Sequence, residues 1–142
     1  MTLTLDETAR RLGETPLFAG VDPVGLEMIA RRVNELDVPA DRPIVRQGEI
    51  GTGFYIIVSG TVEVIRDGVA VARLGPGEFF GELSVLDRMP RNASVAADGP
   101  TSCLALASWD FDAVLLEQPA LTLAILRGVA ARLREVTESV RH

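Results

Sequence analysis

Two different spacings of apolar residues divide this chain into helical ends and a β-rich middle. Over residues 5–13 and 24–33, apolar side chains recur three and four positions apart, which predicts two short helices. Asp22 followed by Pro23 is typical of a helix start, because an aspartate oxygen can accept a hydrogen bond from a free N–H of the first turn. The first part of the chain is therefore predicted to be helical.

From Leu36 to Leu106 the pattern changes to short apolar runs divided by Gly, Pro and Asp residues. Six runs are predicted to be strands: 38, 44–45, 54–58, 62–65, 69–74 and 103–106. Asp67–Gly68 gives the clearest hairpin signal, because both turn positions of such a hairpin need a positive φ. Closely spaced short strands of this kind indicate a sandwich or jelly roll.

Helical spacing returns after Leu106. Ser108 is predicted to cap a helix that stops at Pro119, with Trp109 as a packing anchor. Along the last helix an apolar seam recurs with 3-4-3-4 spacing: Leu126, Val129, Leu133, Val136 and Val140. A single short helix is marginal alone, so the seam must pack on another surface. We expect the part around Leu123 and Ile125 to pack on the strands.

Composition narrows the function classes. The chain has 142 residues, of which 47% are apolar and 24% charged, as in a globular domain. Its net charge of −6 does not favour phosphate backbones, so we expect no direct nucleic-acid binding. The only histidine is His142, which argues against a histidine-built metal, haem or triad site, and we expect no enzyme activity.

The remaining features point to a reducing compartment. Cys103 is the only cysteine, so no intramolecular disulfide can form, and we expect a buried strand thiol in a cytoplasmic protein. The amino terminus lacks the apolar core of a secretory signal. The most apolar long window, residues 113–131, contains Glu117, Pro119 and Arg127, so no membrane span is expected.

The segment 79–97, FFGELSVLDRMPRNASVAA, carries the candidate chemistry. Arg91 offers a planar, permanently charged fork that suits a phosphate, and Glu82 can accept a hydrogen bond from a sugar hydroxyl. Gly81 allows a close approach of the backbone, and residues 82–86 can form a short helix whose amino end favours an anion. Residue types alone leave a second interpretation open, in which Glu82 and Arg91 are solvated or weakly paired.

The same segment resembles the phosphate-binding cassette of cyclic nucleotide-binding domains, and the resemblance covers roughly residues 15–140. Matching features are Gly48 and Gly53, FYIIVSGTVEV, LGPGEFFGEL and PRNASVAA. The resemblance implies that Glu82 meets the ribose 2′-hydroxyl, that Arg91 meets the cyclic phosphate, and that Ala93 donates its backbone N–H. Backbone N–H groups near Leu83 and Ser84 are expected to complete the cradle.

The resemblance also bears on which base is bound. The residue after the arginine is Asn92, where cGMP-selective members commonly have Thr or Ser, so cAMP is expected to bind better than cGMP. Ser84 stands where Ala is common, and its hydroxyl faces either the ligand or a local backbone group. Val71 and Leu74 are candidates for an apolar wall around the base, with ordinary strand core as the alternative.

Part of the base contact is expected from the last helix, partly across a dimer. Relatives of the catabolite activator type use a polar pair there, and here the matching positions are Val136 and Thr137, of which only Thr137 keeps a hydroxyl. Arg132 or Arg134 can stack on the base, or can simply be solvated helix charges. These relatives pair such helices about a two-fold axis, so the seam predicts a C2 homodimer.

The predicted fold is mainly β with flanking helices: a double-stranded β-helix, or jelly roll, with a long carboxy-terminal helix. One domain is expected over 1–142, with amino-terminal helices at 1–35, the β-roll at 36–107 and carboxy-terminal helices at 108–142. The predicted function is a cyclic nucleotide sensor that relays a helix rearrangement to a dimer mate or an unknown protein partner. The alternatives are an interaction module that binds no nucleotide, and the sensor fragment of a Crp-type transcription regulator.

Overall fold

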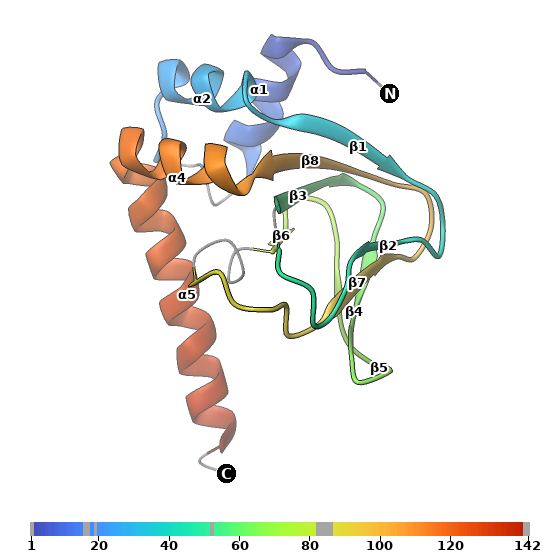
Figure 1. Cartoon of the computed structure of the whole chain (residues 1–142). Coiled ribbons are helices and arrows are strands. Elements are labelled where there is room, and N and C mark those ends of the chain that lie inside the picture. The colour runs from blue at the N-terminus through green and yellow to red at the C-terminus, as the bar shows by residue number, and fades with distance from the viewer. Residues whose placement is uncertain (1, 16–17, 19, 52, 82–86, 141–142) are drawn as a thin grey trace.

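Two four-stranded antiparallel sheets form the body of the protein in the computed structural model, which describes residues 2–15, 18, 20–51, 53–81 and 87–140. The first sheet has the strand order β1 (Asn34–Val38), β8 (Thr101–Ala107), β3 (Gly53–Ser59) and β6 (Phe79–Phe80). The second has the order β2 (Pro43–Val45), β7 (Ser94–Ala97), β4 (Val62–Arg66) and β5 (Val69–Leu74). The prediction of a mainly β fold with flanking helices is confirmed (Figure 1).

Four helices flank the sheets in the described part of the chain: α1 (Leu5–Glu14), α2 (Pro23–Ala30), α4 (Ser108–Glu117) and α5 (Pro119–Val140). The predicted start of α2 is confirmed, because the side chain of Asp22 accepts a hydrogen bond from the N–H of Gly25 at 2.7 Å. Thr4 caps α1 in the same way through the N–H of Glu7. In Figure 1 the helices gather on one side of the roll, and α5 runs away from α4 along its flank.

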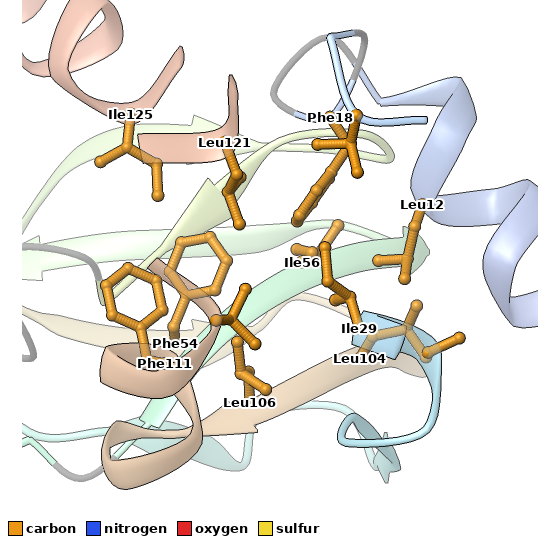
Figure 2. Packing of buried hydrophobic residues seen from close by; sticks show 13 residues of the cluster. Leu12, Phe18, Ile29, Phe54, Ile56, Leu104, Leu106, Phe111, Leu121 and Ile125 are labelled. Carbon is orange, nitrogen blue, oxygen red and sulfur yellow. The ribbon is translucent and has the colours of Figure 1, made fainter. Parts of the chain in front are cut away.

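Two apolar clusters hold these layers together. The first lies between the helices and the outer face of the first sheet, and Figure 2 labels ten of its buried members: Leu12, Phe18, Ile29, Phe54, Ile56, Leu104, Leu106, Phe111, Leu121 and Ile125. Within it the Phe54 and Phe111 rings lie 5.2 Å apart, which ties β3 to α4. The second cluster fills the roll with Val45, Ile57, Val62, Phe80, Val95 and Cys103. Cys103 is thus a buried strand thiol, as expected.

The predicted hairpin is confirmed, because β4 and β5 pair from Val62↔Leu74 to Arg66↔Val69. Its turn residues Asp67 and Gly68 have φ values of 52° and 79°, both positive. The sequence pattern missed β6 and β7. These strands are short, and their pairing with β3, β2 and β4 depends on residues far away in the chain.

Two local predictions about the carboxy-terminal helices were wrong, and a third was right in part. Ala107, and not Ser108, is the cap residue of α4, and no side chain makes a capping hydrogen bond there. Trp109 is 69% exposed and anchors nothing in the described chain. Of the two residues expected to pack on the strands, Ile125 is buried in the first cluster, but Leu123 is 46% exposed and Leu121 is buried in its place. Two residues along a helix turn the side chain by about 200°, so Leu121 and Leu123 face opposite ways.

Among the side chains of helix α5 that the structure describes, those that pack on the body lie in its first half. Leu121 and Ile125 are buried and Val129 packs at the edge of the first cluster, but every side chain described from residue 130 to residue 138 is exposed. Leu126 and Leu133 on the seam are 60% and 66% exposed. No single helix in the described residues is long and apolar enough to cross a membrane; only the bent pair of α4 and α5, taken together, reaches that length and composition.

Candidate functional site

Arg91 is fixed at its backbone by the loop that follows β2. Its N–H donates to the carbonyl of Glu49 at 2.8 Å, and its carbonyl accepts from the N–H of Gly48 at 2.8 Å. Next to it, Pro90 forms an isolated antiparallel bridge with Ile50. The loop at residues 48–50 therefore fixes the backbone of Arg91, although the two segments lie about forty residues apart in the sequence.

The guanidinium of Arg91 lies among three glycines. Its Nη2 donates to the carbonyl of Gly53 at 2.9 Å, and the residue is only 9% exposed. A Cβ placed on Gly51 would come within 2.4 Å of Cζ and Nη2, and one placed on Gly81 within 3.0 Å of Nη1. The glycines leave the space that the flat charged group occupies.

The charge on this group is only partly compensated by the protein. Burial lowers the pKa of Arg91, and the nearby Tyr55 and Glu49 oppose that shift, so the side chain stays cationic at neutral pH. In the described part of the chain no carboxylate forms an ion pair with it. A buried charge without an ionic partner is costly, and a small anion against the guanidinium reduces that cost.

Gly81 has a structural reason to be glycine. Its φ is 91°, in the region that L side chains rarely adopt, and an added Cβ would lie 2.7 Å from the carbonyl oxygen of Gly53. The predicted site residues Glu82, Leu83 and Ser84, and the short helix expected at 82–86, lie outside the described residues. Arg91 and Gly81 are therefore the predicted pair that the structure brings together.

The next two residues lead from Arg91 into β7. Asn92 is exposed, and its carbonyl accepts from Nε of Arg66 on β4 at 3.3 Å. Ala93 is 7% exposed, directly before the first residue of β7. Their predicted contacts with a ligand stay predictions.

The residues predicted to surround the base come from strand β5 and helix α5. Val71 is 52% exposed on the edge strand β5, so it forms no part of an enclosed wall in this chain. Leu74 is half-buried and packs against the cluster inside the roll, as the strand-core alternative expects. Thr137 is exposed on α5, and its hydroxyl donates to the carbonyl of Leu133 at 2.9 Å.

Sequence reasoning missed two residues beside the guanidinium, Gly51 and Tyr55. Tyr55 stacks on Phe80 with ring centroids 5.0 Å apart, and it packs against the cluster inside the roll. Its hydroxyl oxygen would lie 2.8 Å from a Cβ placed on Gly53. The alternation of β3 could have revealed Tyr55, because Phe54 and Ile56 face the helices and the residue between them faces the interior.

One further cavity of about 210 Å³ lies between α1 and β3, next to the turn at Pro76–Gly77. Arg11, Glu14 and Leu104 are among the residues that line it, and none of the predicted ligand residues does. No group of three or more His, Cys, Asp or Glu in the described ranges could hold a metal ion.

The β-roll and its glycine-flanked, buried arginine define a small-ligand-binding domain. The family described as "Cyclic nucleotide-binding domain" matches residues 35–118 of the sequence, which is more than half of the chain. The chain belongs to this family, and the resemblance inferred from the cassette is confirmed.

Curated relatives include regulators from bacteria and fungi. The chain is 35% identical to a "Cyclic AMP receptor protein" of Thermus thermophilus, over 85% of this chain and 58% of that protein. It is 34% identical to a "cAMP-dependent protein kinase regulatory subunit" of Yarrowia lipolytica, over 80% of this chain and 30% of that protein. The chain thus spans between about a third and three fifths of these relatives.

Solved structures agree in fold. The crystal structure of the Thermus thermophilus catabolite activator protein matches with a TM-score of 0.84 at 34% identity, over 89% of this chain and 62% of that chain. The N-terminal domain of a Streptomyces coelicolor transcriptional regulator matches with a TM-score of 0.72 at 31% identity, over 91% and 93% of the two chains. The predicted jelly-roll class is confirmed by these neighbours.

Proposed function

We propose that this cyclic nucleotide-binding sensor domain takes cAMP as its preferred ligand, binds cGMP more weakly and catalyses no reaction. Arg91 binds the cyclic phosphate, Glu82 the ribose 2′-hydroxyl, and backbone N–H groups near Leu83, Ser84 and Ala93 complete the cradle. Two relatives, at 35% and 34% identity, have names that refer to cAMP, which supports this choice of nucleotide.

One observation carries the proposal: the Arg91 guanidinium is buried, with a carbonyl as its hydrogen-bond partner and no ion pair in the described ranges. If a carboxylate of the protein formed an ion pair with Arg91, its charge would already be compensated and the guanidinium would not need an anionic ligand. A buried cation next to three glycines instead matches a compact anion that brings its own negative charge.

Calorimetric titration with cAMP, cGMP and 5′-AMP tests the proposal. Arg91→Ala removes the buried cation and should weaken cAMP binding by about 2–5 kcal/mol if the site is desolvated. Arg73→Ala is the matched control, because Arg73 is an exposed arginine on β5 that pairs with Glu63 and Asp98. Binding that survives Arg91→Ala within a factor of three contradicts the assigned role, and no binding by the unaltered chain favours an interaction module without ligand.

The output of the sensor is proposed to pass through the carboxy-terminal helices. The nucleotide draws the cassette inward, and α4 and α5 re-pack over it as a lid. In a C2 homodimer the exposed seam of α5 pairs with its copy, which brings Thr137 of one chain toward the base bound by the other. A cytoplasmic location and an unidentified protein partner complete this proposal.

A second candidate is the sensor part of a Crp-type transcription regulator. It is favoured by the lengths of the matches, because the chain covers 62% of a "CRP-like cAMP-activated global transcriptional regulator" of Mycobacterium tuberculosis but 93% of the Streptomyces N-terminal domain. Sequencing the gene beyond the codon for His142 tests it: a helix-turn-helix coding region in the same reading frame supports this candidate, and a stop codon contradicts it.

A further inference from the structure

Gly51 lies against the guanidinium of Arg91, in the loop between β2 and β3. It is buried, and a Cβ built on it would meet Cζ and Nη2 of Arg91 at 2.4 Å and Nε at 2.7 Å. Real Cβ contacts essentially never fall below 3.0 Å. An alanine at position 51 and the guanidinium in its present place therefore exclude each other.

The backbone gives no other reason for glycine at this position. Gly48 and Gly81 have φ values of 86° and 91°, so a substitution there strains the backbone. Gly51 has no such φ, and the three atoms nearest to its added Cβ all belong to the guanidinium. The contacts nearest to an added methyl group are therefore those with the arginine of the site.

An added methyl group at Gly51 should displace the guanidinium of Arg91 and leave the strands in place. The atoms that it meets are the tip of a flexible side chain, which can move without shifting the strands. The guanidinium cannot move and keep its contacts, because its Nη2 is bonded to the Gly53 carbonyl at 2.9 Å and its Nη1 lies against Gly81. The substitution therefore displaces the charged group from its hydrogen bond.

We propose that Gly51 is a positioning residue of the anion site: it sets where the Arg91 guanidinium stands and thereby the affinity for a cyclic phosphate. This inference rests on the proposed function of Arg91. A bidentate fork binds an anion only when both N–H groups point at its oxygens, so a displaced guanidinium loses part of that interaction.

The first test compares Gly51→Ala with Gly99→Ala in the full chain. Gly99 is a matched control, because it also lacks a positive φ and an added Cβ there meets nothing within 4 Å. Gly51→Ala should raise the Kd for cAMP about tenfold or more, and Gly99→Ala should leave it within about twofold. An unchanged Kd for Gly51→Ala overturns the proposal.

A double-mutant cycle shows whether the effect passes through the guanidinium. An alanine at position 91 has no side-chain atoms in the place that the added methyl group needs, so Gly51→Ala should cost less than about twofold in cAMP affinity in an Arg91→Ala background. Equal losses in both backgrounds contradict the proposal. If Gly51→Ala alone does not fold, recovery of folding in Gly51→Ala/Arg91→Ala supports the same steric conflict, and failure to recover contradicts it.

A readout without nucleotide separates this inference from the proposed function. The Nε–H signal of Arg91 in a ¹H–¹⁵N spectrum, assigned by its loss in Arg91→Lys, should exchange slowly with water because the group is buried. Gly51→Ala should shift or broaden that signal, and Gly99→Ala should not. An unaltered signal overturns the role of Gly51 even if cAMP binds, whereas a shifted signal without cAMP binding supports it and contradicts only the proposed ligand.

Discussion

At the scale of single residues, the site depends on what surrounds one arginine. Arg91 is 9% exposed and is held by Glu49 and Gly48 at its backbone and by Gly53 at its guanidinium. Gly51, Gly53 and Gly81 lie beside its guanidinium, and without side chains they leave the space in which the charged group is buried. A lysine or a larger neighbour would change the direction in which this charge is presented.

Asn92 is the residue on which the choice of base can be tested. It lacks the hydroxyl that cGMP-selective relatives present, and its side chain stands exposed beside Arg91. Asn92→Thr should raise the relative affinity for cGMP by about 1 kcal/mol, the value of one neutral hydrogen bond. Competition binding with both nucleotides measures the ratio, and a ratio that does not move assigns the selectivity to the helix α5 instead.

Cys103 gives a prediction about pH. Burial, with a smaller contribution from Asp37, raises the pKa of its thiol to about 11 from an ordinary value of 9.0. Between these values the unfolded chain releases a proton that the folded chain keeps, so the free energy of unfolding falls as the pH rises through this window. Urea unfolding at pH 8 to 11 measures the free energy of unfolding of the unaltered chain and of Cys103→Ala. This fall should appear only in the unaltered chain, which carries the thiol. The same dependence of the free energy on pH in both proteins would contradict the prediction.

At the scale of elements, the junction of α4 and α5 is packed tightly on α2. Arg32, just after α2, pairs with Glu117 at the end of α4 at 3.2 Å. Gly25 on α2 stands so close to this junction that an added Cβ would lie 2.5 Å from Oε1 of Gln118. The amino-terminal helices therefore contact the place where the proposed lid helices turn.

Gly25→Ala tests this packing. In an exposed helix the change would be stabilising by roughly 1 kcal/mol, but here the methyl group also meets Val21 at 2.8 Å, so the melting temperature should fall by several degrees. Adding Gln118→Ala removes one of the two conflicts and should restore part of the loss. Thermal unfolding of the single and double variants decides; a rise in melting temperature for Gly25→Ala alone would argue against close packing.

At the scale of the whole molecule, α5 presents apolar side chains that the chain itself does not cover. Leu126 and Leu133 are more than half exposed, whereas Leu121 and Ile125 of the same helix are buried in the core. Isolated exposed leucines are ordinary, but these two lie a heptad apart on one seam of a helix that leaves the body (Figure 1). This arrangement favours pairing with a second copy.

Leu133→Glu tests the dimer, because it would place two unpaired charges in the seam and should give monomers. Light scattering of the unaltered chain should give twice the chain mass of 15.3 kDa at micromolar concentration. Leu116→Glu is the matched control, because Leu116 is 86% exposed on α4, away from the seam. A mass of 15.3 kDa for the unaltered chain rules the dimer out.

The sequence by itself determined the class of fold and the order of its longer elements. Local signals were sufficient for the cap at Asp22, the Asp67–Gly68 hairpin and the long carboxy-terminal helix, because each depends on neighbours along the chain. The cassette motif was also readable, since its residues are close in sequence, and it led to the family that the comparisons confirm.

Only the tertiary structure decided what depends on residues far apart in the chain. It buried Arg91 against Gly51 and Gly53, formed the short strands β6 and β7, and exposed Trp109 where an anchor was predicted. It also settled which face of α5 enters the core, burying Leu121 and not Leu123. The physical reason is that burial and desolvation are set by what packs on a residue from elsewhere, and spacing along the chain does not contain that information.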